Sequence, residues 1–261
     1  MSARFRTLVL VNIVSLIAVL VVNYLSNSLP LNGKTTGQLS DQYPNLFVPT
    51  GLTFSIWGMI YLLLIGWVLV QALGLFSKKQ RAQTEASVIR VGGLFALSCV
   101  FNIAWLFAWH WEHIGLSIGI MVLMLTSLVV LNEKIQNGRA KVSGFEKGFA
   151  HTAFALYQGW ITVALIANVT AFLVAVGWSG FGLSETIWAV LMIGVGAGLA
   201  IYMTMSRNMI FHGLAVCWAL LGIYLKRNAA ADAAAVEYAA LTGIALILVA
   251  IVVRYNRWRA Y

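Results

Sequence analysis

Uncharged stretches long enough to cross a lipid bilayer constrain this chain more than any other feature. A hydrocarbon core about 30 Å thick needs about 20 apolar residues in a helix. Eight runs between polar breaks approach that length, at approximately residues 7–26, 51–75, 91–110, 114–132, 149–176, 184–205, 209–225 and 236–253. We therefore predict an all-α fold, a polytopic membrane helical bundle.

The composition excludes the main soluble classes. Of the 261 residues 61% are hydrophobic and 10% charged, whereas ordinary soluble domains are about half apolar and a quarter charged. A soluble enzyme, a disulfide-stapled secreted protein and a disordered chain are all ruled out. The lipid bilayer is the first partner that the sequence predicts.

The basic residues give the orientation of the bundle. With eight spans, only Lys34, Lys226 and Arg227 of the 17 basic residues fall in outer segments, which leaves 14 inside. Basic residues in short loops favour the cytoplasmic side, so both termini are predicted to be cytoplasmic, in a cell membrane (plasma or inner). The net charge of +9 is thus an orientation signal, and we expect no nucleic-acid partner.

The connection between the first two spans is the one long outer loop. It holds all three prolines, Pro30, Pro44 and Pro49. Connections of about 20 residues are long for packed elements and tend to be lids or binding loops. We expect this loop to close over the outer mouth of the bundle.

The span interiors carry aromatic and amide side chains but no Asp, Glu, Lys or Arg near their middles, which argues against an ion-driven pump. Trp57 and Tyr61 are four residues apart and Asn102 and Trp105 three apart, so each pair shares a helix face. Asn102 and Asn168 should point into the bundle, where each amide binds either a neighbouring helix or a ligand.

Tryptophans near span ends are typical of the aromatic belt at the membrane interfaces, an interpretation we give to Trp109, Trp111, Trp178 and Trp258. Between spans three and four, His110 and His113 are too few for a metal site and are expected to be solvated. The glycines from Gly194 to Gly198 predict close helix packing. No catalytic residue and no metal ligand is assigned.

Three of these clusters, taken in order, resemble the signature of the TspO/MBR family, the tryptophan-rich sensory proteins and translocator proteins. The resemblance covers the first five spans, roughly residues 7–176, and Ser55 stands where the family has a proline. The matching positions are Trp57 and Tyr61 in span two, Asn102 and Trp105 in span three, and Tyr157, Trp160 and Asn168 in span five.

The resemblance implies a five-helix membrane domain over residues 1–176, followed by a three-helix extension over residues 177–261. It also implies a membrane receptor or carrier with a sensory or regulatory stress role. Its aromatic pocket would be lined by the seven matching residues, capped by the long first loop, and would bind a planar hydrophobic ligand such as a porphyrin or a haem-like molecule. No cofactor is required, and a second copy of the chain, as a homodimer, is a further candidate partner.

Two other functions stay open. The family resemblance allows light-dependent porphyrin breakdown, although no nucleophile with a base and no carboxylate pair supports ordinary catalysis here. A small-molecule transporter, in which the last three spans rock against the first five, is the other alternative.

Overall fold

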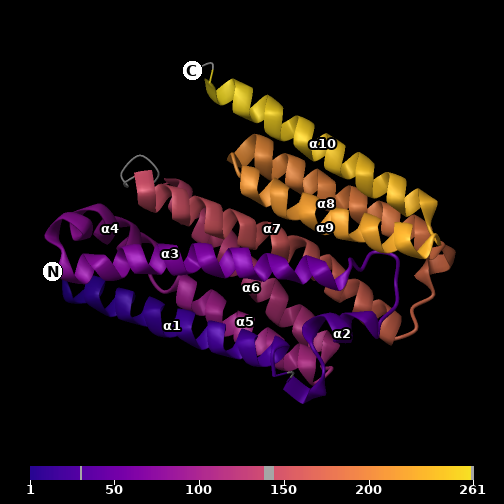
Figure 1. Ribbon diagram of the computed structural model, residues 1–261, viewed down its shortest axis with the longest axis horizontal. Helices are drawn as coiled ribbons and strands as arrows, with labels where there is room; N and C mark the ends of the chain where they lie inside the picture. The colour runs from indigo at the N-terminus through magenta and orange to yellow at the C-terminus, as the bar shows by residue number, and fades with distance from the viewer. Residues whose placement is uncertain (30, 138–143, 260–261) are drawn as a thin grey trace. The chain divides into compact units, whose positions relative to one another are not determined.

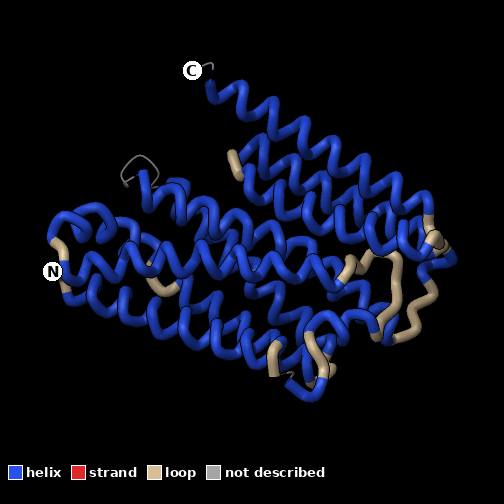
Figure 2. Tube along the Cα trace, viewed as in Figure 1, coloured by secondary structure: helices blue, strands red, loops and turns tan. Residues whose placement is uncertain are grey.

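The computed structural model describes residues 1–29, 31–137 and 144–259, and over these residues it contains helices and loops but no strand (Figure 2). Pro30 of the long loop lies outside the described residues, as do Arg139 and Lys141 of the predicted inner basic set. The prediction of an all-α membrane bundle is confirmed.

Every predicted span coincides with a helix (Figure 1). Within the described residues, seven helical segments are long and apolar enough to cross a membrane, and a bent pair, Lys78–Val91 with Leu94–His110, adds an eighth if it is one span. The long helices are α1 (Ala3–Asn27), α3 (Ile56–Phe76), α5 (Leu94–His110), α6 (Ile114–Asn137), α7 (Gly144–Ala175), α8 (Glu185–Arg207), α9 (Ile210–Ala230) and α10 (Ala234–Arg259). The chain is a multi-pass integral membrane protein.

Helix α4 (Lys78–Val91) lies between the second and third predicted spans, where the sequence predicts only a connection. Its N-terminus is capped by Ser77, whose hydroxyl accepts from the Gln80 backbone N–H at 3.3 Å. It ends at Gly92, which has a φ of +59° that only glycine adopts freely. Arg81 on this helix donates to the carbonyl of Gly74 at 2.9 Å, so one of the predicted inner charges caps the end of α3.

The chain forms two compact units. Unit 1 comprises residues 1–35 and 57–155, and unit 2 comprises residues 36–56 and 156–261. Helix α7 runs from one into the other, and the second half of the long outer loop belongs to unit 2. The division into domains at residue 176 stays a prediction.

Unit 1 has an aromatic centre. Trp67, Phe95 and Phe154 meet edge to face in all three pairings, with ring centroids 4.9 to 5.9 Å apart. Aromatic pairs in this geometry stabilise beyond the area they bury. The Asn12 amide donates to Oε1 of Gln71 at 2.8 Å, so a buried polar contact joins α1 to α3.

In unit 2 helices α8, α9 and α10 pack on one another (Figure 1). Close helix packing is predicted at the glycines of α8, but only one of them contacts a neighbouring helix closely. A Cβ at Gly196 would lie 3.8 Å from Ile166, but one at Gly194 or Gly198 would meet nothing within 4 Å. The close-packing interpretation is therefore wrong for Gly194 and Gly198. Other glycines make the tight approaches in this unit.

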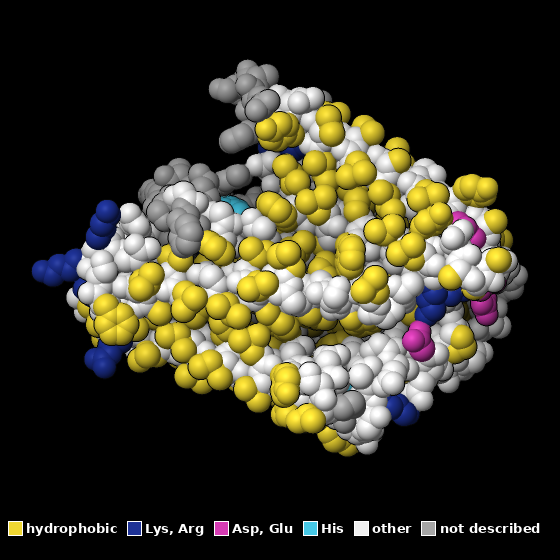
Figure 3. Space-filling model, viewed as in Figure 1, with side chains coloured by type: hydrophobic (Ala, Val, Ile, Leu, Met, Phe, Trp, Pro, Cys, Tyr) yellow, Lys and Arg dark blue, Asp and Glu magenta, His cyan; other side chains and the backbone are white. Residues whose placement is uncertain are grey.

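Apolar side chains cover the helices, and charges gather near helix ends (Figure 3). Val14 is 66% exposed and Leu62 65%, values suited to hydrocarbon contact. In three ion pairs the basic residue is one predicted on the outer side. The pairs are Lys34 with Glu112 in unit 1, at 3.1 Å, and Lys226 with Asp41 and Arg227 with Asp232 in unit 2, at 2.6 and 2.7 Å. The cytoplasmic assignment of the termini stays a prediction.

Candidate functional site

The seven residues predicted to bind a ligand are divided between the two units. Trp57, Tyr61, Asn102 and Trp105 belong to unit 1, whereas Tyr157, Trp160 and Asn168 belong to unit 2. Their role as one site stays a prediction.

Trp57 and Tyr61 stack on each other along α3. Their ring centroids are 5.4 Å apart and their planes differ by 18°, as the four-residue spacing predicts. Both side chains are half-buried. The pair therefore presents a flat aromatic surface of the kind that ligand sites use.

Asn102 contacts a neighbouring helix. It is completely buried, and its Oδ1 accepts from the Asn23 amide on α1 at 2.9 Å. Asn23 also donates to the carbonyl of Val19 at 2.9 Å. Of the two roles open for this amide, binding between helices is the one with a described partner.

We expect the Asn23–Asn102 pair to contribute measurable coupling. In a double-mutant cycle of Asn23→Leu and Asn102→Leu, the free energies of unfolding in mixed detergent micelles should differ from additivity by about 0.6 to 1.7 kcal/mol, the range for hydrogen bonds inside membranes. Additive free energies, with ligand affinity lost in Asn102→Leu alone, would identify this amide as a ligand contact.

Trp105 stacks on Trp109 one turn further along α5. The centroids are 6.0 Å apart, the planes differ by 16°, and the two residues are only 6% and 5% exposed. The interpretation of Trp109 as an interface anchor is wrong, because its ring packs inside unit 1. Trp111 is 47% exposed and fits the belt.

His110 also differs from its predicted solvated state. Its side chain is fully buried, and its Nδ1 lies 2.8 Å from the carbonyl oxygen of Leu106. The His110 carbonyl accepts from the Asn32 amide at 2.9 Å. This histidine therefore helps to fasten the end of α5, whereas His113 is exposed as predicted.

In unit 2 Tyr157, Trp160 and Asn168 are each 3% exposed. Trp160 meets Phe54 edge to face, with centroids 5.7 Å apart and planes at 80°. Phe54 belongs to the short helix η2 (Gly51–Ser55) at the end of the long outer loop. The predicted tryptophan on α7 thus packs against the beginning of the predicted second span, directly after the loop predicted to act as a lid.

A pocket of about 550 Å³ lies in unit 2, and Tyr157, Trp160 and Asn168 are not among its lining residues. Its walls are the second half of α7, the turn after it, the start of α8 and three residues of the outer loop. The lining residues are Asn45, Leu46, Phe47, Leu165, Ile166, Val169, Thr170, Leu173, Val174, Trp178, Ser179, Gly180, Leu183, Glu185, Trp188, Ala189 and Met192.

Two indoles form the aromatic part of this pocket. Trp178 and Trp188 have centroids 5.1 Å apart with planes at 56°, and Trp178 also meets Phe181 edge to face. The indole N–H of Trp188 donates to the Gly180 carbonyl at 2.8 Å. Gly180 has a φ of +67°, and a Cβ there would lie 3.2 Å from Nε1 of Trp188, so glycine permits this close approach.

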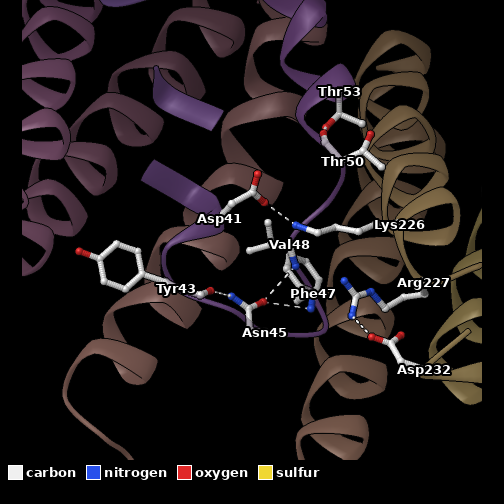
Figure 4. A network of polar contacts seen from close by, with 10 residues as sticks. All are labelled: Asp41, Tyr43, Asn45, Phe47, Val48, Thr50, Thr53, Lys226, Arg227 and Asp232. Atoms are coloured by element: carbon white, nitrogen blue, oxygen red, sulfur yellow. Dashed lines mark hydrogen bonds and ion pairs between the residues drawn. The ribbon is translucent and has the colours of Figure 1, made fainter. Parts of the chain in front are cut away.

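The loop wall of the pocket is held in shape by Asn45 (Figure 4). Its Oδ1 accepts from the backbone N–H groups of Phe47 and Val48, both at 3.0 Å, and its Nδ2 donates to the Tyr43 carbonyl at 2.8 Å. Phe47 and Val48 are each 2% exposed. The loop wall of the pocket is therefore a hydrogen-bonded turn whose apolar side chains are buried.

The same loop is fastened to α9. The Thr50 N–H donates to the Gly222 carbonyl at 3.2 Å, and the indole of Trp218 donates to the Thr53 carbonyl at 2.9 Å. Asp41, which precedes the pocket wall in the sequence and ends α2 (Thr36–Asp41), forms its ion pair with Lys226 (Figure 4). One helix of the C-terminal extension thus holds the loop that lines the pocket.

Sequence reasoning missed Trp178, Glu185 and Trp188 as pocket residues. The position of Trp178 at a span end predicts a place in the aromatic belt. The available signal was the proximity of two tryptophans and a carboxylate across one short connection, together with the long loop before the second span. Which connection the loop would cover could not be read from one sequence.

The whole chain carries a family signature. A family model described as TSPO-like protein matches residues 9–253. The chain belongs to the TSPO-like protein family. The match extends beyond the first five spans, which carry the resemblance, and takes in α8, α9 and most of α10. Neither a curated protein nor a solved structure matches this chain.

Proposed function

We propose that this TSPO-like protein is a membrane receptor or carrier that binds a planar hydrophobic ligand of the porphyrin type, with a sensory or regulatory role. The observation that carries the proposal is the pocket of about 550 Å³ in unit 2, walled by α7, α8 and the outer loop. This volume is in the range of about 300 to 1,000 Å³ typical of small-molecule sites.

The lining favours a flat apolar molecule. Trp178, Trp188 and Phe47 offer aromatic surface, and leucine, isoleucine and valine side chains of α7 supply most of the opposite wall. Indole rings are rigid, so stacking a flat ring on them costs little conformational entropy. The stacked Trp57 and Tyr61 pair of unit 1 is a second candidate site for the same ligand class.

Titration with protoporphyrin dimethyl ester, which has the flat ring without free carboxylates, tests the proposal in uncharged detergent. Porphyrin fluorescence is the readout, because it is unaffected by the number of tryptophans removed. We expect saturable binding, with Kd raised about tenfold, or ~1.4 kcal/mol, in Trp178→Ala. Trp111→Ala, which removes an exposed indole outside the pocket, is the control and should leave Kd unchanged.

Two results would go against this proposal in different ways. Non-saturable uptake by the parent protein would refute binding of this ligand class. A raised Kd in Trp57→Ala, with none in Trp178→Ala, would move the site from the unit 2 pocket to the residues predicted from the sequence.

A further inference from the structure

The pocket carries one charged side chain whose charge no described partner balances. Glu185 lines the pocket at the first turn of α8, and none of the described ion pairs includes it. Lys226 and Arg227, the two basic residues predicted on the outer side of unit 2, each form an ion pair with another acidic residue. Lys226 is held by Asp41 at 2.6 Å and Arg227 by Asp232 at 2.7 Å (Figure 4).

A structural role accounts for part of this placement. Ser184 caps α8 through its hydroxyl, which accepts from the Ile187 N–H at 3.3 Å. An acidic residue just after the cap stabilises the helix, because its charge interacts favourably with the positive end of the helix dipole. Glu237 has the same position in the first turn of α10 but is not among the pocket residues. Only at Glu185 does the carboxylate coincide with an apolar, tryptophan-lined wall.

A carboxylate beside indole rings is the chemistry that recognises organic cations. The negative face of a tryptophan ring attracts a cationic group, most strongly where the group is desolvated, and the carboxylate adds charge attraction. A carboxylated ligand would instead meet a like charge. We infer that the unit 2 pocket selects a flat or elongated apolar ligand with a positively charged amine or ammonium group, held by Glu185 beside Trp178 and Trp188.

This inference rests on the proposed function, because it takes the same pocket and a flat apolar ligand. It narrows the ligand to a cationic one and so disfavours porphyrins that carry free carboxylates. Rhodamine 6G and fluorescein are suitable probes, because they share a flat xanthene ring but carry opposite charges. The full-length protein in uncharged detergent should bind rhodamine 6G at least about tenfold more tightly than fluorescein. Fluorescence polarisation of each dye gives the Kd.

The isosteric variant Glu185→Gln isolates the charge. We expect it to weaken rhodamine 6G binding about tenfold and to leave fluorescein unchanged or tighter. Glu237→Gln is the matched control, since it removes the same charge from the first turn of a neighbouring helix outside the pocket, and it should change neither Kd. Added salt should weaken rhodamine 6G binding to the parent more than to Glu185→Gln.

The outcomes separate this inference from the function on which it rests. Equal affinities for the two dyes, or identical effects of Glu185→Gln and Glu237→Gln, would overturn the charge selectivity while porphyrin ester binding and its loss in Trp178→Ala still stand. Failure of the porphyrin ester and both dyes to bind saturably would refute the pocket itself, and the inference with it.

Discussion

Replacing Gly159 by alanine is expected to lower the free energy of unfolding by about 2 to 3 kcal/mol, the cost of overpacking a well-filled interior. A Cβ at this position would lie 2.5 Å from the carbonyl oxygen of His212 and 2.9 Å from its Cα. Both atoms belong to the backbone of α9, so no side-chain rotation can relieve the contact. The two helices must separate, and buried apolar contacts between α7 and α9 are lost.

Gly194→Ala is the matched control, because a Cβ there meets nothing within 4 Å. Its free energy of unfolding should be unchanged or raised by up to about 1 kcal/mol, the difference in helix propensity between glycine and alanine. Unfolding in mixed detergent micelles, followed by circular dichroism, measures both variants. Equal stability of Gly159→Ala and the parent would show that α7 and α9 are less closely packed than described.

A second variant separates backbone from side-chain obstruction at the same site. Ala215 contributes a Cβ that would be 2.9 Å from the new methyl group of Gly159→Ala. Adding Ala215→Gly removes that atom but leaves the His212 carbonyl in place. We therefore expect no recovery of stability in the double variant.

Helix number and type follow from the sequence because the bilayer imposes length and apolarity on every span. Periodicity also predicts that Trp57 and Tyr61 share a face, and their stacking confirms it. Helix α4 is different, since its residues are polar and no hydrocarbon thickness fixes its length. Its cap at Ser77 and its stop at Gly92 are local signals, but they do not distinguish a short surface helix from a loop.

The pocket depends on tertiary placement. Asn45 and Phe47 are more than a hundred residues from Trp178 and Glu185 in the sequence, yet they line one volume. Trp109 and Trp178 have the same sequence signature, an indole near a span end. One is buried on Trp105 while the other lines the pocket. A position near a span end fixes where a tryptophan lies along its helix. It does not show which neighbouring segment covers the side chain.

Replacing Gly222 by alanine is expected to displace the loop wall and weaken ligand binding by about tenfold, or ~1.4 kcal/mol. A Cβ on Gly222 would lie 2.0 Å from Cγ2 of Thr53 and 3.0 Å from Cβ of Pro49. Thr53 is 2% exposed, and its carbonyl accepts from the Trp218 indole. Because Thr53 cannot move alone, we expect the preceding loop to shift with it, including the residues that form the pocket wall.

Two measurements follow this displacement in a variant lacking the native cysteines. A cysteine at position 48, where Val48 is 2% exposed, should react with a maleimide at least about tenfold faster in Gly222→Ala, and protoporphyrin ester should bind more weakly. Thr53→Ser deletes the obstructing methyl and keeps the hydroxyl that donates to the Thr50 carbonyl. The double variant should therefore regain most of both properties, unlike the pair at Gly159. Faster labelling without recovery in the double variant would mean that Gly222 acts through something other than its contact with Thr53.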